Sequence, residues 1–457
     1  MKNVFEFLHL SRPRHLEDLL AFLRIPSISA QAAYRPDIER AADFLCDELK
    51  DLGLTVEKIT GEGNPLVYAQ TEIDPSRPTI LIYGHYDVQP VDPEELWNSP
   101  PFEPLVKDGI IYARGASDDK GQLYAHVKAV EAFVRTGTPL PVNVKFLIEG
   151  EEEKGGDSVY EYTEKNPAKL ACDAVLVSDT SLYNEDTPAI TFSLRGMCYT
   201  EILVDGPGQD LHSGSFGGTV RNPGNAIAAI VASLHDGNGR VTVPGFYDDV
   251  VELDAEGRAE FDRLGYGEAE LVRDTGSPAS FGEANYSTLE RMWVRPTCDV
   301  NGLWSGYIGE GGKTIIPSKA GAKVSMRLVP NQDPDKIARA FTDHVNAVAP
   351  SGVKVEVKVL HNAKPVLVPR DSAMMQAGLR ALETGFGKKA LFVGEGGSIP
   401  ITGTFQACLK VPVIMLGYGL PNDNIHSPNE KFHLDNYYNG IRTSVAFFDE
   451  ASRLTRK

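Results

Sequence analysis

The sequence predicts an α/β fold: a mixed, mostly parallel sheet with helices on both faces, plus an inserted two-layer α/β domain. Two observations predict the sheet. Compact apolar runs suit buried strands, and helical stretches separate several of them. A third observation predicts the insertion, because segments between about 195 and 363 alternate apolar and polar residues like strands with one face in water. The 457 residues are enough for more than one domain.

Buried strands and amphipathic helices are expected in the outer parts of the chain. Helices are predicted at 16–23 and at 36–52, where the second ends before Gly53. A further helix is predicted at 123–135. The predicted buried strands are 79–83 (TILIY), 142–148 (VNVKFLI), 174–177 (AVLV) and 411–416 (VPVIML). These elements place 1–194 and 364–457 in one domain that is split in the sequence.

The middle of the chain has a different pattern, which predicts strands and helices in the order β-α-β-α-β. Strands are expected at 200–204, 323–329 and 353–360, and helices at 222–235 and 334–349. The polar, acidic stretch 236–280 is expected to form loops and surface helix. We therefore predict that 195–363 is an inserted domain of two layers.

Charge and composition exclude several classes of partner. The chain has 45 basic and 63 acidic residues and a net charge of −18, which repels phosphate backbones and anionic lipid. Neither nucleic acid nor membrane is expected as a partner. No signal peptide is recognised in the first 20 residues, and no apolar run approaches the ~18–20 residues of a membrane span. Five dispersed cysteines without a CxxC pair argue against disulfides and a thiolate zinc site. A cytoplasmic location is expected.

Histidines and acids follow the predicted buried strands, in one case at the end of a loop that reaches His426, and a pair of acids opens the helix at 123–135. Ligands of open α/β sheets bind outside the carboxyl ends of the strands. The four acids of 149–153 repel one another unless they are solvated or hold a cation. Taken singly, the alternatives are ordinary: a glutamate run is often a solvated loop, and Asp119 or Ser117 could cap a helix. The side chains in question are His85, Asp87, Asp118, Asp119, Glu149, Glu151, Glu152, Glu153, Asp179 and His426.

This combination of imidazole and carboxylate, without thiolate, suits hard or borderline divalent cations. Two histidines and at least three carboxylates are too many for one tetrahedral zinc with an open position. They fit two ions bridged by a carboxylate, a centre that activates water near neutral pH. A neighbouring carboxylate that is not a ligand can accept the proton of that water. The residues therefore predict metal-assisted hydrolysis.

With these residues, the chain resembles the di-zinc metallopeptidase family of carnosinases, cytosolic nonspecific dipeptidases, aminoacylases, glutamate carboxypeptidases and acetylornithine deacetylases. Within that family it is most similar to the dipeptidase branch. The matching segments run in family order over nearly the whole chain. They are GHYDVQP (84–90), RGASDDKGQ (114–122), EGEEEKGG (149–156), VSDT (177–180), DLHSGSFGG (210–218), GGKTIIP (311–317), SMRLVP (325–330), GEGGSIP (394–400) and HSPNEK (426–431). The resemblance implies a zinc-exopeptidase-like catalytic domain with an inserted lid and dimerisation domain.

The resemblance also implies a role for each metal-site residue. Glu152 is expected to be the general base, and Asp87 to orient a ligand histidine. The implied ligands are His85 and Asp179 for one ion, His426 and Glu153 for the other, and Asp118 as the bridge. A shift of one residue in EGEEEKGG, which has a Glu where dipeptidases commonly have Met, would instead make Glu151 the base and Glu152 the ligand. Two divalent ions per subunit are implied, with zinc expected and manganese or cobalt as alternatives.

A second group of residues is implied to contact substrate. His212 would stabilise the oxyanion in the active site of a partner subunit, with Thr314 near it, so a homodimer is implied. Arg327 would bind the substrate carboxylate, because a guanidinium group matches it. The plainer alternatives are a turn histidine and a strand arginine on the wet face. His361, Gly397 and Ser398 match positions at the substrate end.

The expected activity is hydrolysis of a dipeptide or small peptide. The alternatives are an N-acyl-amino-acid deacylase or carboxypeptidase of the same family, or a relative that binds peptides without catalysis. A P-loop NTPase is not favoured, because 306–314 has the wrong spacing for a phosphate-binding loop. A serine hydrolase is not favoured, because the sequence has no GxSxG motif.

Overall fold

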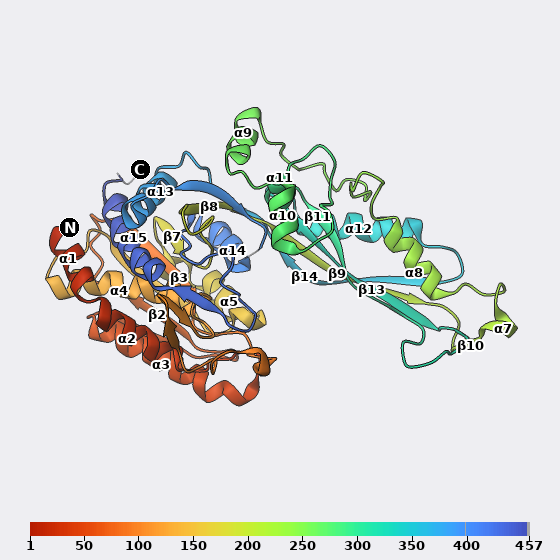
Figure 1. Cartoon of the computed structure of the whole chain (residues 1–457), viewed down its shortest axis with the longest axis horizontal. Helices are drawn as coiled ribbons and strands as arrows, with labels where there is room; N and C mark the ends of the chain where they lie inside the picture. The colour runs from red at the N-terminus through yellow and green to blue at the C-terminus, as the bar shows by residue number, and fades with distance from the viewer. Residues whose placement is uncertain (398, 455–457) are drawn as a thin grey trace. The chain divides into compact units, whose positions relative to one another are not determined.

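The computed structural model describes residues 1–397 and 399–454, which form two compact units (Figure 1). The first unit comprises Met1–Phe192, Val368–Val393 and Thr404–Lys457. The second comprises Ser193–Leu367 and Gly394–Gly403. The predicted insertion spans 195–363, and the second unit differs from it chiefly in taking the segment 394–403 as well.

A mixed sheet, most of whose strands belong to the first unit, has the strand order β1-β2-β6-β3-β7-β17-β8-β15, with β16 paired to β8. The neighbouring strands β6, β3, β7 and β17 run parallel, whereas β1, β2, β8 and β15 pair antiparallel at the two edges. The predicted fold class is therefore confirmed. The strands are β1 (Thr55–Ile59), β2 (Leu66–Gln70), β3 (Thr79–His85), β6 (Asn143–Glu149), β7 (Ala174–Val177), β8 (Ala189–Leu194), β15 (Val366–Leu367), β16 (Leu391–Glu395) and β17 (Val413–Met415).

Helices cover both faces of this sheet, as two neighbouring residues of β3 demonstrate. A Cβ atom built on Gly84 would lie 2.9 Å from Leu123 of α4 (Lys120–Thr136). The ring of Tyr83 meets Phe405 of α14 (Pro400–Leu409) at 5.4 Å between centroids. Because successive residues of a strand point to opposite faces, α4 and α14 lie on opposite sides. The other helices of this unit are α1 (Lys2–Leu10), α2 (Arg12–Leu23), α3 (Arg35–Asp51), α5 (Ser158–Lys165), α6 (Pro167–Leu170), α13 (Ala373–Phe386) and α15 (Leu434–Ser452).

The predicted elements of the first unit differ from the observed ones mainly at their ends. The helix expected at 16–23 begins at Arg12, and the strand expected at 411–416 spans only Val413–Met415. The sequence reading missed β1 and β2, which lie toward one edge of the sheet. A separate small sheet consists of β18 (Lys431–His433), β5 (Ile110–Tyr112) and β4 (Leu105–Lys107).

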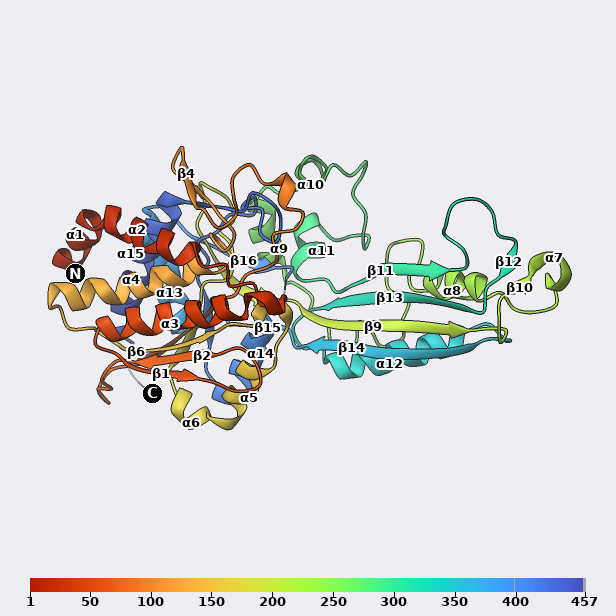
Figure 2. The same ribbon diagram turned by 90° about the horizontal axis from the view of Figure 1, so that it is seen from below.

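The second unit contains a four-stranded antiparallel sheet of order β11-β13-β9-β14, which Figure 2 shows as four adjacent arrows. Its strands are β9 (Gly196–Asp205), β11 (Thr297–Ser305), β13 (Lys319–Leu328) and β14 (Lys354–Ala363). Helices α8 (Pro223–Ala232) and α12 (Pro334–Val348) pack on one face, where Ile227 and Phe341 join Ile202 and Val324 in a buried core. The sequence reading missed β11, whose residues are mostly exposed and whose register shifts between Val300 and Gly302.

The polar stretch 236–280 contains α9 (Ala255–Arg263) and α10 (Glu268–Thr275), joined by loops. The remaining elements of this unit are short: β10 (Leu211–His212), α7 (Ser213–Phe216), α11 (Thr288–Trp293) and β12 (Ile315–Ile316). Within the part of the chain that the structure describes, no helix has the length and hydropathy needed to cross a bilayer.

Candidate metal centre

The candidate metal centre lies where the parallel strands of the first unit end. Strand β3 ends at His85 and β6 ends at Glu149, and these two residues are directly paired across the sheet. The loop after β6 carries Glu152 and Glu153, and Asp179 follows β7 by two residues. Because these strands run parallel, the side chains that follow them meet at one edge.

Two groups of side chains at this edge have the composition of metal sites. One group is His85, Asp118 and Asp179, and the other is Asp118, Glu153 and His426; within each group the ligand atoms lie within 4.8 Å of one another. Asp118 belongs to both groups. Its Oδ1 lies 3.0 Å from Nε2 of His85, and its Oδ2 lies 2.9 Å from Nε2 of His426. Each carboxylate oxygen thus faces a different histidine, the arrangement required of a bridging ligand.

The remaining ligand candidates lie slightly farther out. Oε2 of Glu153 is 3.2 Å from Nε2 of His426, and Oδ2 of Asp179 is 4.0 Å from Nε2 of His85. His426 adopts the left-handed backbone conformation with φ 59, a conformation that non-glycine residues adopt mainly where the surroundings impose it. The peptide bond between Asp118 and Asp119 is cis.

The Asp87 carboxylate, which was expected to orient the ring of His85, makes its shorter contacts with the loop after β6. Nδ1 of His85 lies 3.0 Å from the backbone oxygen of Asp87 and 3.5 Å from its carboxylate. The carboxylate accepts hydrogen bonds from the backbone nitrogens of Glu152 and Glu153, at 3.3 Å and 3.1 Å. The nearer contact to His85 thus comes from the main chain of Asp87, and its carboxylate ties the end of β3 to the loop that carries the two glutamates.

Burial and like charges shift the pKa values in the centre. Burial, followed by the nearby Glu153 and Asp118 carboxylates, raises the pKa of Glu152 to about 7. Burial also opposes ionisation of Asp118, but hydrogen bonds from His426 and His85 hold the pKa of Asp118 below its usual value. Hydrogen bonds to Asp118 and Glu153 raise the pKa of His426 to about 10.

These shifts show that the cluster has more negative charge than its own residues neutralise. A divalent cation would relieve the same repulsion, and imidazole with carboxylate is a donor set suited to zinc, manganese or cobalt. Two ions that share the Asp118 carboxylate fit the residues present. The ligands would be His85 and Asp179 on one side, and His426 and Glu153 on the other.

Sequence reasoning missed Glu430, a buried carboxylate that joins two of the ligand loops. Glu430 has no exposed surface, and its Oε2 accepts hydrogen bonds from Arg114 at 2.8 Å and from the backbone nitrogen of Gly115 at 2.9 Å. Its Oε1 accepts from the backbone nitrogens of Ser117 and Asp118, at 3.0 Å and 3.1 Å. Glu430 thus links the segment that presents Asp118 to the segment that begins at His426. The sequence signal that could have found it is its place in the matching segment HSPNEK (426–431), four residues after His426.

The predicted substrate residues that the structure describes lie in the second unit. Nδ1 of the exposed His212 accepts hydrogen bonds from the backbone nitrogens of Gly214 and Ser215, at 3.0 Å and 3.2 Å. A neutral His212 therefore carries its proton on Nε2, which can act as a donor. Thr314 is close in the structure, because its backbone oxygen accepts from Ser213 at 3.0 Å.

Arg327 and His361 share one face of the four-stranded sheet. Arg327 pairs with Met197 and His361 pairs with Tyr199, and positions two apart on β9 face the same side. This is the face opposite to α8 and α12, because the intervening Cys198 belongs to the helix-covered core. The backbone nitrogen of Gly397 donates to Glu395 at 3.2 Å. Ser398 lies outside the described residues.

Comparison with known proteins finds full-length relatives. Residues 81–450 match the model of peptidase family M20/M25/M40. The chain is 35% identical to the Cys-Gly metallodipeptidase dug1 of Schizosaccharomyces pombe, over 100% of this chain and 99% of the relative. It is 31% identical to the Beta-Ala-His dipeptidase of Homo sapiens, over 99% and 93%.

Solved structures of related proteins have the same fold as this chain. Human carnosine dipeptidase 1 superposes with a TM-score of 0.84 at 31% identity, over 99% of both chains. The M20 family metallo-carboxypeptidase Sso-CP2 from Sulfolobus solfataricus superposes with a TM-score of 0.85 at 35% identity, over 96% of this chain and 99% of that one. With a family model that spans most of its length, and relatives that align from end to end, this chain belongs to peptidase family M20/M25/M40 and is a hydrolase of peptide bonds.

Proposed function

We propose that this protein is a metal-dependent dipeptidase that hydrolyses the peptide bond of small dipeptides. The observation that carries the proposal is the position of Asp118, whose two carboxylate oxygens face His85 and His426, with the half-buried Glu152 in the loop after β6. Relatives named as dipeptidases over nearly their whole length support a dipeptide substrate.

Each residue of the centre has a defined task in this proposal. His85, Asp118, Glu153, Asp179 and His426 hold two divalent ions, proposed to be zinc, with manganese or cobalt as alternatives. When bound, the ions polarise the scissile carbonyl and lower the pKa of water. Glu152 takes the proton of the attacking water at a carboxylate oxygen and passes it to the leaving amine. The short 3-10 helix η3 (Glu152–Lys154) and the Asp87 contacts hold Glu152 in place.

The second unit is proposed to act as a lid and dimerisation domain. His212 would donate from Nε2 to the developing oxyanion in the partner's active site, an interaction worth about 2.7–4 kcal/mol. Its Nδ1 hydrogen bonds to the backbone support this tautomer. Arg327 would bind the substrate carboxylate, and Thr314, His361, Gly397 and Ser398 would line the substrate site. We also propose a cytoplasmic location, in keeping with the free thiols of all five cysteines.

The test is a substrate panel on protein reconstituted separately with Zn²⁺, Mn²⁺ and Co²⁺. We expect hydrolysis of Cys-Gly, β-Ala-His or Ala-Ala, and loss of that activity with a chelator. The panel also includes longer peptides and N-acetyl amino acids, the substrates of a second candidate function. That candidate is a carboxypeptidase, which the similarity to Sso-CP2 favours, or an N-acyl-amino-acid deacylase. Hydrolysis of longer peptides or N-acetyl amino acids, with none of the dipeptides cleaved, would replace the dipeptidase proposal.

A further inference from the structure

The run of three glutamates at 151–153 contains one acid that the proposed mechanism does not use. Glu152 and Glu153 are assigned to the metal centre, but Glu151 belongs to neither group of ligand candidates. It is nevertheless buried, with 2% of its surface exposed. A buried carboxylate costs free energy unless its oxygens have partners, so its contacts indicate what it does.

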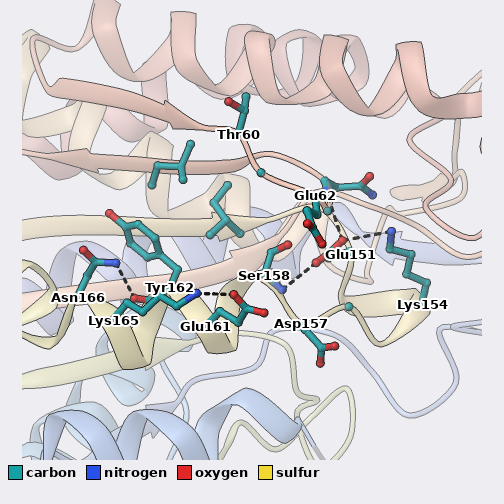
Figure 3. A pocket seen from close by; sticks show the side chains of 16 residues that line it. Thr60, Glu62, Glu151, Lys154, Asp157, Ser158, Glu161, Tyr162, Lys165 and Asn166 are labelled. Atoms are coloured by element: carbon teal, nitrogen blue, oxygen red, sulfur yellow. Dashed lines mark hydrogen bonds and ion pairs between the residues drawn. The ribbon is translucent and has the colours of Figure 1, made fainter.

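Glu151 connects three separate segments of the first unit. Its Oε2 accepts a hydrogen bond from the backbone nitrogen of Asn64, in the loop between β1 and β2, at 2.9 Å. Its Oε1 accepts from the backbone nitrogen of Ser158, the first residue of α5, at 2.9 Å. Lys154, in the same loop, places its Nζ 3.2 Å from Oε2. Figure 3 shows Glu151 between Ser158 and Lys154.

Two glycines beside Glu151 leave the space that its carboxylate occupies. A Cβ atom at Gly63 would lie 2.6 Å from either carboxylate oxygen, and one at Gly156 would lie 2.2 Å from Cδ. Asn64 adds a further tie, because its side-chain nitrogen donates to the backbone oxygen of Gly150 at 2.5 Å. The loop is therefore joined to its surroundings on both sides of Glu151.

The next two residues of the loop are held from a different direction. The Asp87 carboxylate accepts from the backbone nitrogens of Glu152 and Glu153. Gln89 donates to Oε2 of Glu153 at 2.8 Å. Glu152 and Glu153 thus follow directly after the Glu151 anchor and are also held by the segment after β3. Without the Glu151 carboxylate, the loop would lose the contacts from Asn64 and Ser158 and would depend more on the second set.

We propose that Glu151 is a positioning residue that sets the placement of Glu152 and Glu153 through the loop backbone. The inference rests on the proposed function, in which Glu152 is the base and Glu153 a ligand. Misplacing a reacting group by about 1 Å can cost on the order of 100-fold in rate. Residues that hold metal ligands typically contribute about 10–100-fold to metal affinity.

Two substitutions and one matched control test the proposal. Glu151→Met removes both acceptors, and Glu151→Gln keeps one oxygen. The control is Glu161→Gln, on α5, whose exposed carboxylate lines the same surface pocket and pairs with Lys165. The measurements are kcat and KM on a cleaved dipeptide, Zn²⁺ affinity by competition with a chromogenic chelator, and circular dichroism of the metal-free protein.

For Glu151→Met we expect kcat to fall at least about tenfold with KM within about threefold, and Zn²⁺ affinity to fall about tenfold or more. Glu151→Gln should lose less, because its amide oxygen still accepts one backbone N–H. Glu161→Gln should match the wild type. If Glu151→Met does not fold, Glu151→Gln decides the question alone.

Wild-type kcat and Zn²⁺ affinity in a folded Glu151 variant would overturn the proposal, and so would equal losses in Glu161→Gln. The two proposals fail separately. If the wild-type protein cleaves no dipeptide, the proposed function fails, and the Zn²⁺ affinities of the variants still decide the role of Glu151.

Discussion

Asp118 and Asp119 are identical in chemistry and adjacent in sequence, yet their surroundings differ. The oxygens of Asp118 face two histidines, which hold its pKa below the usual value against the effect of burial. Burial, and then the charge of Asp118, raises the pKa of Asp119 to about 8. Asp119 accepts the backbone N–H of His85 at 3.2 Å and its Oδ1 has no hydrogen-bond partner among the described residues. The partner geometry, and not the residue type, assigns the two roles.

Replacing the proposed base should remove turnover and leave the metal bound. In Glu152→Gln, kcat is expected to fall about 10²–10⁴-fold, because the amide cannot accept the proton. Two ions per subunit should remain, since Glu152 belongs to neither ligand group. Metal content after gel filtration and kcat on the same sample check both points. Retained turnover, or loss of an ion, would contradict the assignment.

His126 should make the protein less stable in mild acid. The ring is fully buried between Ser178 and Ser444, and burial lowers its pKa to about 3. The unfolded chain has a histidine pKa of about 6.5. The folded state thus favours the neutral ring, and its contribution to stability is complete above pH 6.5 and declines as the pH falls toward 3. At pH 5.5 the loss is roughly 1.4 kcal/mol.

His126→Gln provides the comparison, because it removes the titrating group. The quantity to compare is the free energy of unfolding of the wild type minus that of the variant. We expect this difference to be roughly 1.4 kcal/mol smaller at pH 5.5 than at pH 7.5. Urea unfolding of chelator-treated protein at the two pH values measures this difference. An unchanged difference would show that the ring does not titrate as its burial indicates.

At the scale of elements, the metal centre depends on loops that are far apart in sequence. The parallel strands β3, β6 and β7 bring three loop starts to one edge of the sheet. The segments that carry Asp118 and His426 come from elsewhere, and Glu430 joins them by hydrogen bonds to Arg114 and to three backbone nitrogens. The strands alone would not place these two ligands.

Glu430→Gln should therefore weaken both folding and metal binding. The amide nitrogen cannot accept a hydrogen bond, so one pair of buried donors loses its partner, at a cost of about 1–3 kcal/mol. Zn²⁺ affinity should fall about 10–100-fold. Urea unfolding and chelator competition measure the two effects.

Glu131→Gln is the matched control for Glu430→Gln. Glu131 is also buried in the first unit, but it pairs with Arg14, His15 and Lys128 and not with the ligand loops. It should lose stability and keep the wild-type Zn²⁺ affinity. If both variants lose affinity equally, Glu430 has no specific link to the metal centre.

At the scale of the whole molecule, the proposed active site is shared between subunits. The ligand candidates and Glu152 all lie in the first unit, whereas His212, Thr314 and Arg327 lie in the second. The chain has 63 acidic residues, many more than the metal centre contains, and its net charge is −18. A net charge far from zero opposes self-association of proteins. A dimer in which His212 serves the other subunit follows from the proposed function.

Mixing two inactive variants tests the shared site. In a dimer of His212→Ala with Glu152→Ala, one active site has an intact Glu152 and receives His212 from its partner. Random pairing of equal amounts should restore about a quarter of the wild-type activity, and the purified mixed dimer should have about half, because one of its two sites is complete. Co-expression followed by purification of the mixed dimer, with each variant alone as control, checks this. No recovery in a confirmed mixed dimer would count against action between subunits.

The sequence by itself determined the fold class, the family and the metal chemistry. Apolar runs predicted the central strands because a buried parallel strand needs them on both faces. It did not predict edge strands such as β11, whose exposed residues carry little apolar pattern, nor the buried contacts of Glu151, and it left the one-residue shift in the glutamate run as an alternative. Only the tertiary structure decided these contacts, because their partners are far apart in sequence: the backbone nitrogens of Asn64 and Ser158 donate to the Glu151 carboxylate, whereas the Asp87 carboxylate accepts from the backbone nitrogens of Glu152 and Glu153.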